Sequence, residues 1–408
     1  MPRVLRIINR FNLGGPTHNV AYLSKYLAPE FETMLVGGKW GENEEGSQHI
    51  LDNLGLEPTF LPEMQREVAP WRDRAAYRRI KQLIQEFKPD IVHTHAAKAG
   101  AVGRMAAADM GVPVIVHTFH GHIFHSYFGK VRTQLYKSIE RYLARRSTRI
   151  VAISERQKDE LVNEHRICPA EKVTVIPLGF DLSRFQTDQA EKRKLFRKVY
   201  GVDDDEVAIG IVGRLVPVKN HGLFLDALHN MSERTGRRVR AFIVGDGEER
   251  ERLEQKVGDL GLSMARGPYF NGHGFGHGVN GKPVVPKATV TFTSWIKEID
   301  IVNAGVDVIA LTSLNEGTPV SLIEAQASNR AVVSTDVGGI ENVVISGRTA
   351  LLSASQDEAA LADNLLRVVE DDHLRERMSN AGWQHVKSRY HFNRLVEDTA
   401  AMYRSLLR

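Results

Sequence analysis

The feature that most constrains the fold is a repeated pattern of a short apolar run, a polar or glycine-rich turn, and a stretch with helical periodicity. Such alternation predicts strands joined by helices, and therefore parallel α/β sheets. In the first half of the chain the expected strands are 4–8, 33–36, 91–94, 114–117, 150–153 and 173–176. The expected helices between them are 19–27, 74–87, 100–110, 131–145 and 155–164, the last opened by a capping box at Ser154 and Gln157.

The pattern restarts in the second half, after a charged segment at 186–205 that predicts a linker with a short helix. The expected strands are 207–212, 239–244, 289–292, 306–311 and 331–334, and the expected helices are 222–231, 248–260, 297–304, 320–328, 358–370 and 374–388. A last helix at 393–407 has one apolar face. Two successive α/β units predict two doubly wound sheets, with ligands outside the carboxyl ends of the strands and in a cleft between the domains.

Length and composition exclude several classes of protein. The 408 residues are too many for one compact core. A net charge of only +4 argues against a nucleic-acid binder. The chain has no apolar run of about 18 residues for a membrane span and no signal-peptide pattern. The single cysteine, Cys168, cannot form an internal disulfide, so we expect a cytoplasmic protein.

The strongest local motif is segment 313–324, which contains Glu316 and Glu324. Thr318 suits an N-cap and Pro319 the first turn of a helix. Glu316 is then expected in the loop before this helix and Glu324 in its second turn. The free N–H groups of a helix N-terminus favour an anion such as phosphate, flanked here by carboxylates that accept hydrogen bonds from sugar and ribose hydroxyls. Taken alone, the segment is more simply a capped surface helix with two solvated acids.

Two glycine-containing turns follow expected strands. Segment 213–219, GRLVPVK, places Arg214 and Lys219 in one loop, where two cations suit a diphosphate, although a solvated loop is an equally ordinary interpretation. Gly245 lies in the turn VGDGE after strand 239–244, which is weak evidence of ligand binding by itself.

The order GRLVPVK, VGDGEE, NEGTPVSLIEA and VGGIE resembles glycosyltransferase family 4, a family of retaining enzymes with the GT-B fold of two Rossmann-like domains facing a cleft. NLGG at 12–15, HG at 120–121 and IPLGFD at 176–181 agree with it, so the resemblance covers nearly the whole chain. It implies an acceptor-binding domain at 1–185, a donor-binding domain at 186–392, and a C-terminal helix, 393–408, that crosses back to the first domain. Asn220 replaces a glycine of many relatives, and Thr318 replaces an aromatic residue.

The resemblance also implies roles for individual residues. The expected catalytic residues are His120 at the donor sugar, Arg214 and Lys219 at the diphosphate, and Glu316 at the sugar hydroxyls. The expected donor-binding residues are Gly14, Gly15, Gly245, Gly317, Thr318, Pro319, Val320, Ser321 and Glu324, the last at the ribose. The two glutamates are assigned to binding and not to a hydrolase pair. We expect no metal cofactor, because Arg214 and Lys219 supply the positive charge.

The histidines leave two interpretations open, a metal site and a polar cleft lining. A metal site among His93, His95, His117, His120, His122 and His125 is disfavoured, since they lack helical i, i+4 pairing and a nearby carboxylate. His273 and His277, in the glycine-rich loop expected at 267–282, are disfavoured as ligands for similar reasons. We expect a polar cleft lining instead, with His95 and Lys98 as acceptor-binding candidates.

Basic residues gather in the run Arg72, Arg74, Arg78, Arg79 and Lys81, and on a helix with Lys130, Arg132, Lys137, Arg141, Arg145 and Arg146. The other face of that helix is Val131, Leu135, Ile139 and Tyr142. Such helices suit an anionic membrane at the inner face or a lipid-linked phosphate, although a solvated basic face is the more common meaning.

The sequence thus predicts transfer of a sugar from a nucleotide donor, uridine diphosphate being favoured, to a glycan, lipid-linked or small acceptor in cell-surface polysaccharide or glycoconjugate synthesis. The alternatives are a GT-B epimerase and a non-catalytic nucleotide-sugar-binding protein. A dinucleotide oxidoreductase is disfavoured, because no Gly-x-Gly-x-x-Gly follows an early strand.

Overall fold

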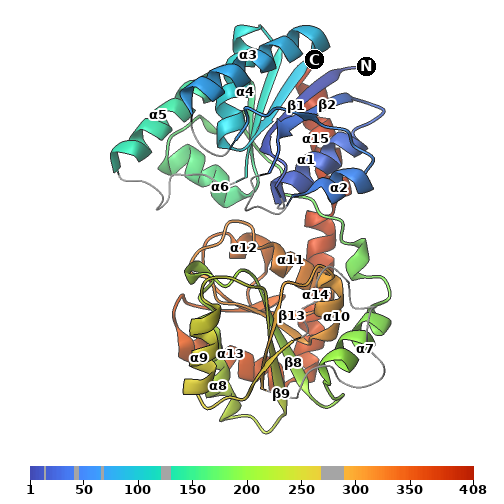
Figure 1. Cartoon of the computed structure of the whole chain (residues 1–408), viewed down its shortest axis with the longest axis vertical. Helices are drawn as coiled ribbons and strands as arrows, with labels where there is room; N and C mark the ends of the chain where they lie inside the picture. Colours follow the sequence, from blue (N-terminus) through green and yellow to red (C-terminus); the bar gives the residue numbers. More distant parts are fainter. Residues whose placement is uncertain (13–14, 41–45, 66–68, 121–129, 268–288) are drawn as a thin grey trace. The chain divides into compact units, whose positions relative to one another are not determined.

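The computed structural model describes residues 1–12, 15–40, 46–65, 69–120, 130–267 and 289–408 (Figure 1). The chain forms two compact units, Met1–Phe180 with Arg389–Arg408, and Asp181–Ser388. Each unit contains a seven-stranded sheet in which the paired strands are parallel. The predicted parallel α/β architecture is therefore confirmed.

The first unit has the strand order β3-β2-β1-β4-β5-β6-β7. Its strands are β1 (Arg3–Arg10), β2 (Glu32–Gly38), β3 (Thr59–Phe60), β4 (Ile91–His95), β5 (Val114–Phe119), β6 (Arg149–Ala152) and β7 (Val173–Val175). The chain order reverses between β1 and β4, which is the switch point where ligands bind in doubly wound sheets. The sequence missed only the edge strand β3, whose two residues are too few to form a pattern.

Helices cover both faces of this sheet (Figure 1). They are α1 (Gly15–Tyr26), α2 (Gln48–Asn53), α3 (Pro70–Phe87), α4 (Ala97–Asp109), α5 (Lys130–Arg146), α6 (Glu155–Asp159) and α15 (Phe392–Leu406). Leu5 packs with α3 and α4 on one face, whereas Val4 packs with α1 and α15 on the other. The C-terminal helix is thus part of the core of the first unit.

The capping box predicted before α6 forms only in part. The hydroxyl of Ser154 accepts a hydrogen bond from the backbone N–H of Gln157 at 3.1 Å, as an N-cap does. The side-chain oxygen of Gln157 instead accepts from the N–H of Ile153 at 2.9 Å. Beyond α6 the chain continues as a π-helical turn, Glu160–Glu164, so the helix predicted at 155–164 is helical but not uniformly α.

The second unit has the strand order β10-β11-β9-β8-β12-β13-β14, with its switch point between β8 and β12. Its strands are β8 (Val207–Val212), β9 (Val239–Val244), β10 (Met264–Arg266), β11 (Val290–Ser294), β12 (Val308–Leu311), β13 (Ala331–Thr335) and β14 (Ala350–Ser353). Its helices are α7 (Gln189–Tyr200), α8 (His221–Ser232), α9 (Arg250–Asp259), α10 (Ile299–Gly305), α11 (Val320–Ala327), α12 (Ile340–Val343), α13 (Glu358–Glu370) and α14 (Asp372–Tyr390).

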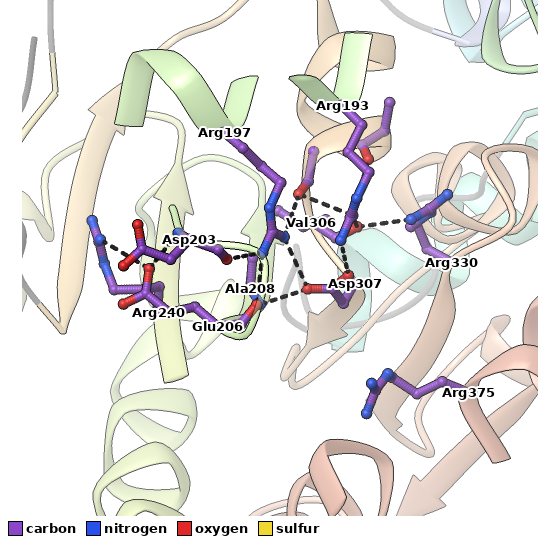
Figure 2. Close-up of polar contacts among 12 residues, drawn as sticks. Arg193, Arg197, Asp203, Glu206, Ala208, Arg240, Val306, Asp307, Arg330 and Arg375 are labelled. Atoms are coloured by element: carbon purple, nitrogen blue, oxygen red, sulfur yellow. Dashed lines mark hydrogen bonds and ion pairs between the residues drawn. The ribbon is translucent and has the colours of Figure 1, made fainter. Parts of the chain in front are cut away.

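Helix α7, in the segment expected to be a linker, is held to the second unit by an ion-pair cluster (Figure 2). Arg193 and Arg197 both bind Asp307, at 2.8 and 3.3 Å, and Asp307 also accepts from the backbone N–H of Ala208 at 2.8 Å. Arg193 and Arg330 donate to the carbonyl of Val306. These bonds satisfy the free carbonyls after α10 and attach α7 to the starts of β8 and β12.

Candidate active site

The switch point of the second unit brings together the loops after β8 and β12. Nζ of Lys219 lies 2.5 Å from Oε1 of Glu316, and the hydroxyl of Ser313 donates to the same oxygen at 2.6 Å. The hydroxyl of Thr312 donates to the carbonyl of Asn220 at 2.9 Å, which joins the two loops directly. Two residues predicted from separate motifs therefore form one ion pair.

A third loop, after β13, supports the glutamate. The N–H of Gly339 donates to the carbonyl of Glu316 at 2.8 Å. A Cβ at Gly338 would overlap that carbonyl, and a Cβ at Gly339 would overlap the carbonyl of Gly317. The motif VGGIE therefore has a steric cause: only glycine permits this approach of two backbones.

The turn after β9 meets the loop after β8 in the same way. Gly245 has φ = +143°, and a Cβ there would overlap the carbonyl of Gly213, next to Arg214. Arg214 itself is exposed. Asn220 has φ = +48°, a left-handed conformation that glycine adopts freely and asparagine tolerates, which accounts for the departure from the family's glycine.

Helix α11 begins at Val320, as predicted, but its N-cap differs from the predicted one. Pro319, with ψ = 92°, occupies the N-cap position, so the assignment of Thr318 as N-cap is wrong, and no side chain caps the helix. A residue before proline is disfavoured in the helical region, which keeps Thr318 outside the helix. The first N–H groups of the helix, at Val320 and Ser321, consequently lack a side-chain cap and are suited to an anion.

Glu324 lies in the second turn of α11, as predicted, but it is not a solvated acid. Its side chain is 19% exposed, and its nearest cation is Arg184, with Nη2 at 3.7 Å from Oε1. Burial raises the pKa of Glu324 to about 7, although Arg184 opposes the shift. The carboxyl therefore keeps its proton to a higher pH than an ordinary glutamate does.

The histidines of the first unit form a buried group at its switch point. Nδ1 of His95, at the end of β4, lies 2.9 Å from Nε2 of His120, which follows β5. The rings of His93 and His95 stack with centroids 4.3 Å apart. Burial lowers the pKa of His120 to about 4 and the pKa of His93 and His95 well below the ordinary value, so all three are neutral at pH 7.

His117 is separate from these three and bonds Thr94 at 2.8 Å. Within the described ranges, no group of three or more histidine, cysteine or acidic side chains could hold a metal ion. His122, His125, His273 and His277 lie outside these ranges, as does nearly all of the glycine-rich segment.

The other candidates of the first unit differ in what surrounds them. Lys98 is 10% exposed and pairs with Asp73 at 2.7 Å, so its charge is already balanced. Gly15 is the first residue of α1 and has ordinary space for a Cβ, whereas Gly14 lies outside the described residues. Between His95 and α4, Ala96 adopts φ = 68° and ψ = 161°, a conformation normally restricted to glycine and concentrated at functional sites.

Sequence reasoning missed three residues of these sites. Ser313 lay inside the recognised motif but received no role. Arg6 and Tyr403 both contact the histidine group, with Nη1 of Arg6 3.2 Å from His95 and the Tyr403 hydroxyl 2.5 Å from His93. An arginine in the middle of an apolar strand was the available signal for Arg6.

Two parallel-sheet units with polar loops at their switch points are the architecture of the GT-B glycosyltransferases. The family model described as Glycosyltransferase Family 4 matches residues 13–184, and models described as Glycosyl transferases group 1 match residues 192–265 and 277–371. The chain belongs to glycosyltransferase family 4 and is an enzyme that takes its sugar from a nucleotide-sugar donor.

Relatives of established name agree with this class. The UDP-Gal:alpha-D-GlcNAc-diphosphoundecaprenol alpha-1,3-galactosyltransferase of Escherichia coli is 29% identical over 76% of this chain and 74% of its own. The capsular polysaccharide biosynthesis glycosyltransferase CapM of Staphylococcus aureus is 24% identical over 85% of this chain and 84% of its own. Among solved structures, Anabaena Alr3699/HepE in complex with UDP matches with a TM-score of 0.78 at 20% identity, covering 99% of this chain and 100% of that one.

Proposed function

We propose that this glycosyltransferase transfers a sugar from a UDP-sugar to a lipid-linked glycan acceptor, with retention of the anomeric configuration, in polysaccharide or glycoconjugate synthesis. The observation that carries the proposal is the ion pair of Lys219 and Glu316 at the switch point, beside the exposed Arg214. The Escherichia coli relative is named for a UDP-Gal donor and a diphosphoundecaprenol acceptor, and the Anabaena structure contains UDP, which supports this choice of donor and acceptor.

The charges at the switch point fit the leaving of a nucleoside diphosphate. Breaking the bond between the anomeric carbon and the phosphate oxygen places negative charge on the diphosphate and positive charge on the sugar. Arg214, Lys219 and the uncapped N–H groups of α11 stabilise the diphosphate. As Lys219 turns towards the phosphate, the carboxylate of Glu316 becomes free to accept hydrogen bonds from sugar hydroxyls.

Retention without a nucleophile from the enzyme requires the acceptor to attack from the face that the diphosphate leaves. The acceptor oxygen forms a bond to the anomeric carbon, the bond to the phosphate oxygen breaks, and the departing phosphate takes the acceptor's proton. No side chain of the chain is needed as a nucleophile, and no step requires a metal. Activity should therefore persist in the presence of a chelator.

Helix α5 supports a peripheral contact with an anionic membrane, where a lipid-linked acceptor would reside. Leu135, Ile139 and Tyr142 lie on one face of the helix, and their exposed fractions are 59%, 39% and 45%. Arg145 and Arg146 follow on the same helix and are exposed. Apolar residues beside cations are typical of helices that lie in a membrane interface. None of the helices in the described ranges has the length and apolarity that crossing a membrane requires.

The central experiment incubates the protein with a panel of nucleotide sugars and a diphosphoprenyl-glycan acceptor, then measures released nucleotide and the anomeric configuration of the product. Product with the anomeric configuration of the donor supports the proposal, and an inverted product contradicts retention. Conversion of the donor without any acceptor would indicate an epimerase instead. Thermal stabilisation by UDP without turnover would indicate a binding protein.

The membrane contact is tested by sedimentation with vesicles of phosphatidylglycerol and phosphatidylcholine. Replacing Leu135 and Ile139 by serine is expected to abolish sedimentation while turnover of a soluble acceptor persists. Equal sedimentation of the wild type and this variant would contradict the contact.

A further inference from the structure

Arg6 is a buried cation in the middle of β1, and no carboxylate in the described part of the chain pairs with it. Its side chain is fully buried. Nη1 lies 3.3 Å from Nδ1 of His93 and 3.2 Å from Nε2 of His95, and Nη2 lies 3.3 Å from the hydroxyl of Tyr403. A guanidinium can only donate hydrogen bonds, so its neighbours must accept them.

This requirement determines where the hydrogen of His95 lies. Nη1 of Arg6 carries two hydrogens and has two ring-nitrogen neighbours, so each of those nitrogens accepts one hydrogen bond. Nε2 of His95 therefore carries no hydrogen, and the single hydrogen of the neutral ring is on Nδ1. That N–H donates to Nε2 of His120 at 2.9 Å.

The same argument assigns the tautomer of His120. Because its Nε2 accepts from His95, the hydrogen of its neutral ring is on Nδ1. This Nδ1 is buried and has no hydrogen-bond partner in the described part of the chain. A buried donor without an acceptor is unfavourable, so an oxygen atom supplied by a ligand would be favoured there.

Tyr403, from the C-terminal helix α15, is the third side chain that contacts Arg6. Its hydroxyl accepts from Nη2 of Arg6 and donates to Nδ1 of His93 at 2.5 Å, so the single lone pair of that nitrogen is shared between this short bond and the longer one from Nη1 of Arg6 at 3.3 Å. His93 then carries its hydrogen on Nε2, which donates to the hydroxyl of Thr118 at 2.7 Å. His93 thus has the tautomer opposite to that of His95.

We propose that Arg6 is a positioning residue that holds His95 and His120 in the Nδ1–H tautomer, so that His120 meets the donor sugar as a hydrogen-bond donor through Nδ1. The proposal rests on the proposed function and on the role at the donor sugar that the family resemblance implies for His120. The ligand atom it requires is an oxygen acceptor, such as a sugar hydroxyl.

The tautomers are measured directly by ¹⁵N NMR of the full-length protein labelled at histidine, at pH 7. We expect Nδ1 to be protonated in His95 and His120 and Nε2 to be protonated in His93, with signals assigned by single His→Gln variants. A His120 ring protonated on Nε2 in the wild type overturns the proposal. This measurement needs no turnover, so it separates failure of the proposal from failure of the proposed function.

Variants then test the part played by Arg6. R6M removes the hydrogen-bond donors while it fills a similar volume. We expect His95 and His120 to lose their preference for the Nδ1–H tautomer in this variant. We also expect kcat to fall tenfold or more and KM to change less than threefold. R6K keeps a cationic donor and should restore much of both. Y403F is the matched control, because Tyr403 contacts Arg6 and His93 but not His95. It should alter His93 and leave the tautomer of His120 unchanged.

A purely structural role for Arg6 predicts a lower unfolding temperature in R6M with an unchanged His120 tautomer. This result overturns the proposal.

Substitutions of His120 test whether its Nδ1 donates a hydrogen bond to the donor sugar. Asparagine places an amide N–H near the position of Nδ1, whereas glutamine places one near Nε2. We expect H120N to retain at least tenfold more kcat/KM than H120Q, and equal losses overturn the assignment of Nδ1.

Discussion

Lys219 and Glu316 lie 97 positions apart in the sequence, yet their charged atoms are 2.5 Å apart at the switch point of the second sheet. The ion pair holds the two side chains in place before a donor binds, although they come from separate loops. It also means that each residue determines the position of the other, so removing either changes both the phosphate and the sugar contacts.

The first prediction concerns this pair. K219A and E316A should each lower kcat by about 10²–10³-fold, which is the usual loss when one preorganised charge-stabilising group is removed. Because the side chains of Lys219 and Glu316 are only 25% and 9% exposed, removing either should also lower the unfolding temperature, so turnover is measured at a temperature at which each variant is folded. Turnover is measured as released nucleotide, and V218A is the control, since the Val218 side chain is 41% exposed in the same loop. Wild-type rates in both variants would refute the site assignment.

A second prediction follows from the raised pKa of Glu324. The native carboxyl holds its proton up to a pKa of about 7, whereas the unfolded chain loses it near the ordinary value of 4.5. The native state therefore binds more protons between these values, and the contribution of Glu324 to the free energy of unfolding falls as pH rises through this window. E324Q removes this dependence.

Denaturant unfolding of wild type and E324Q at pH 4.5 and pH 8 measures the effect. The variant should gain stability relative to the wild type at pH 8. A difference in unfolding free energy that does not vary with pH would show that Glu324 titrates normally.

Much of the fold could be predicted because both faces of these sheets are buried. Strands β8 and β9 were predicted to the residue, since a parallel strand covered on both sides is a continuous apolar run with a clear start and end. Strands β10 and β14, at the two edges of the second sheet, were missed; only the middle residue of β10 is buried, so this strand forms no apolar run.

The sites were predicted as residues but not as pairs. Each motif marks one loop, whereas the contact of Lys219 with Glu316 depends on which strands are neighbours. The contact of Arg6 with Tyr403 joins residues 397 positions apart, and no local pattern encodes it. The N-cap of α11 was misassigned because Thr318 and Pro319 both suit a helix start, and the choice depends on the backbone around them.

The third prediction concerns the attachment of α7. D307A should destabilise the protein by about 3–5 kcal/mol, the usual cost of removing one partner of a buried ion pair, because the side chain of Arg197 is only 6% exposed. Arg193, Arg197 and the N–H of Ala208 would all lose the carboxylate that they share. D205A is the matched control: Asp205 pairs with Arg238, but both side chains are more than half exposed, so the loss should be much smaller than that of D307A. Equal losses in urea unfolding would contradict the structural role of Asp307.

The last prediction tests the glycine that supports Glu316. G339A places a Cβ against the carbonyl of Gly317, so the loops after β12 and β13 must separate. We expect a destabilisation of about 1–3 kcal/mol, typical of overpacking, and a loss of kcat because the ion pair of Glu316 with Lys219 is displaced. G258A is the control, because Gly258 lies in α9 with open space around its Cβ position. Alanine there should stabilise the protein by about 0.5–1 kcal/mol, since it lowers the entropy of the unfolded chain, and should leave kcat unchanged. A G339A variant with wild-type stability and turnover would mean that the two loops separate without cost and that Gly339 does not determine the position of Glu316.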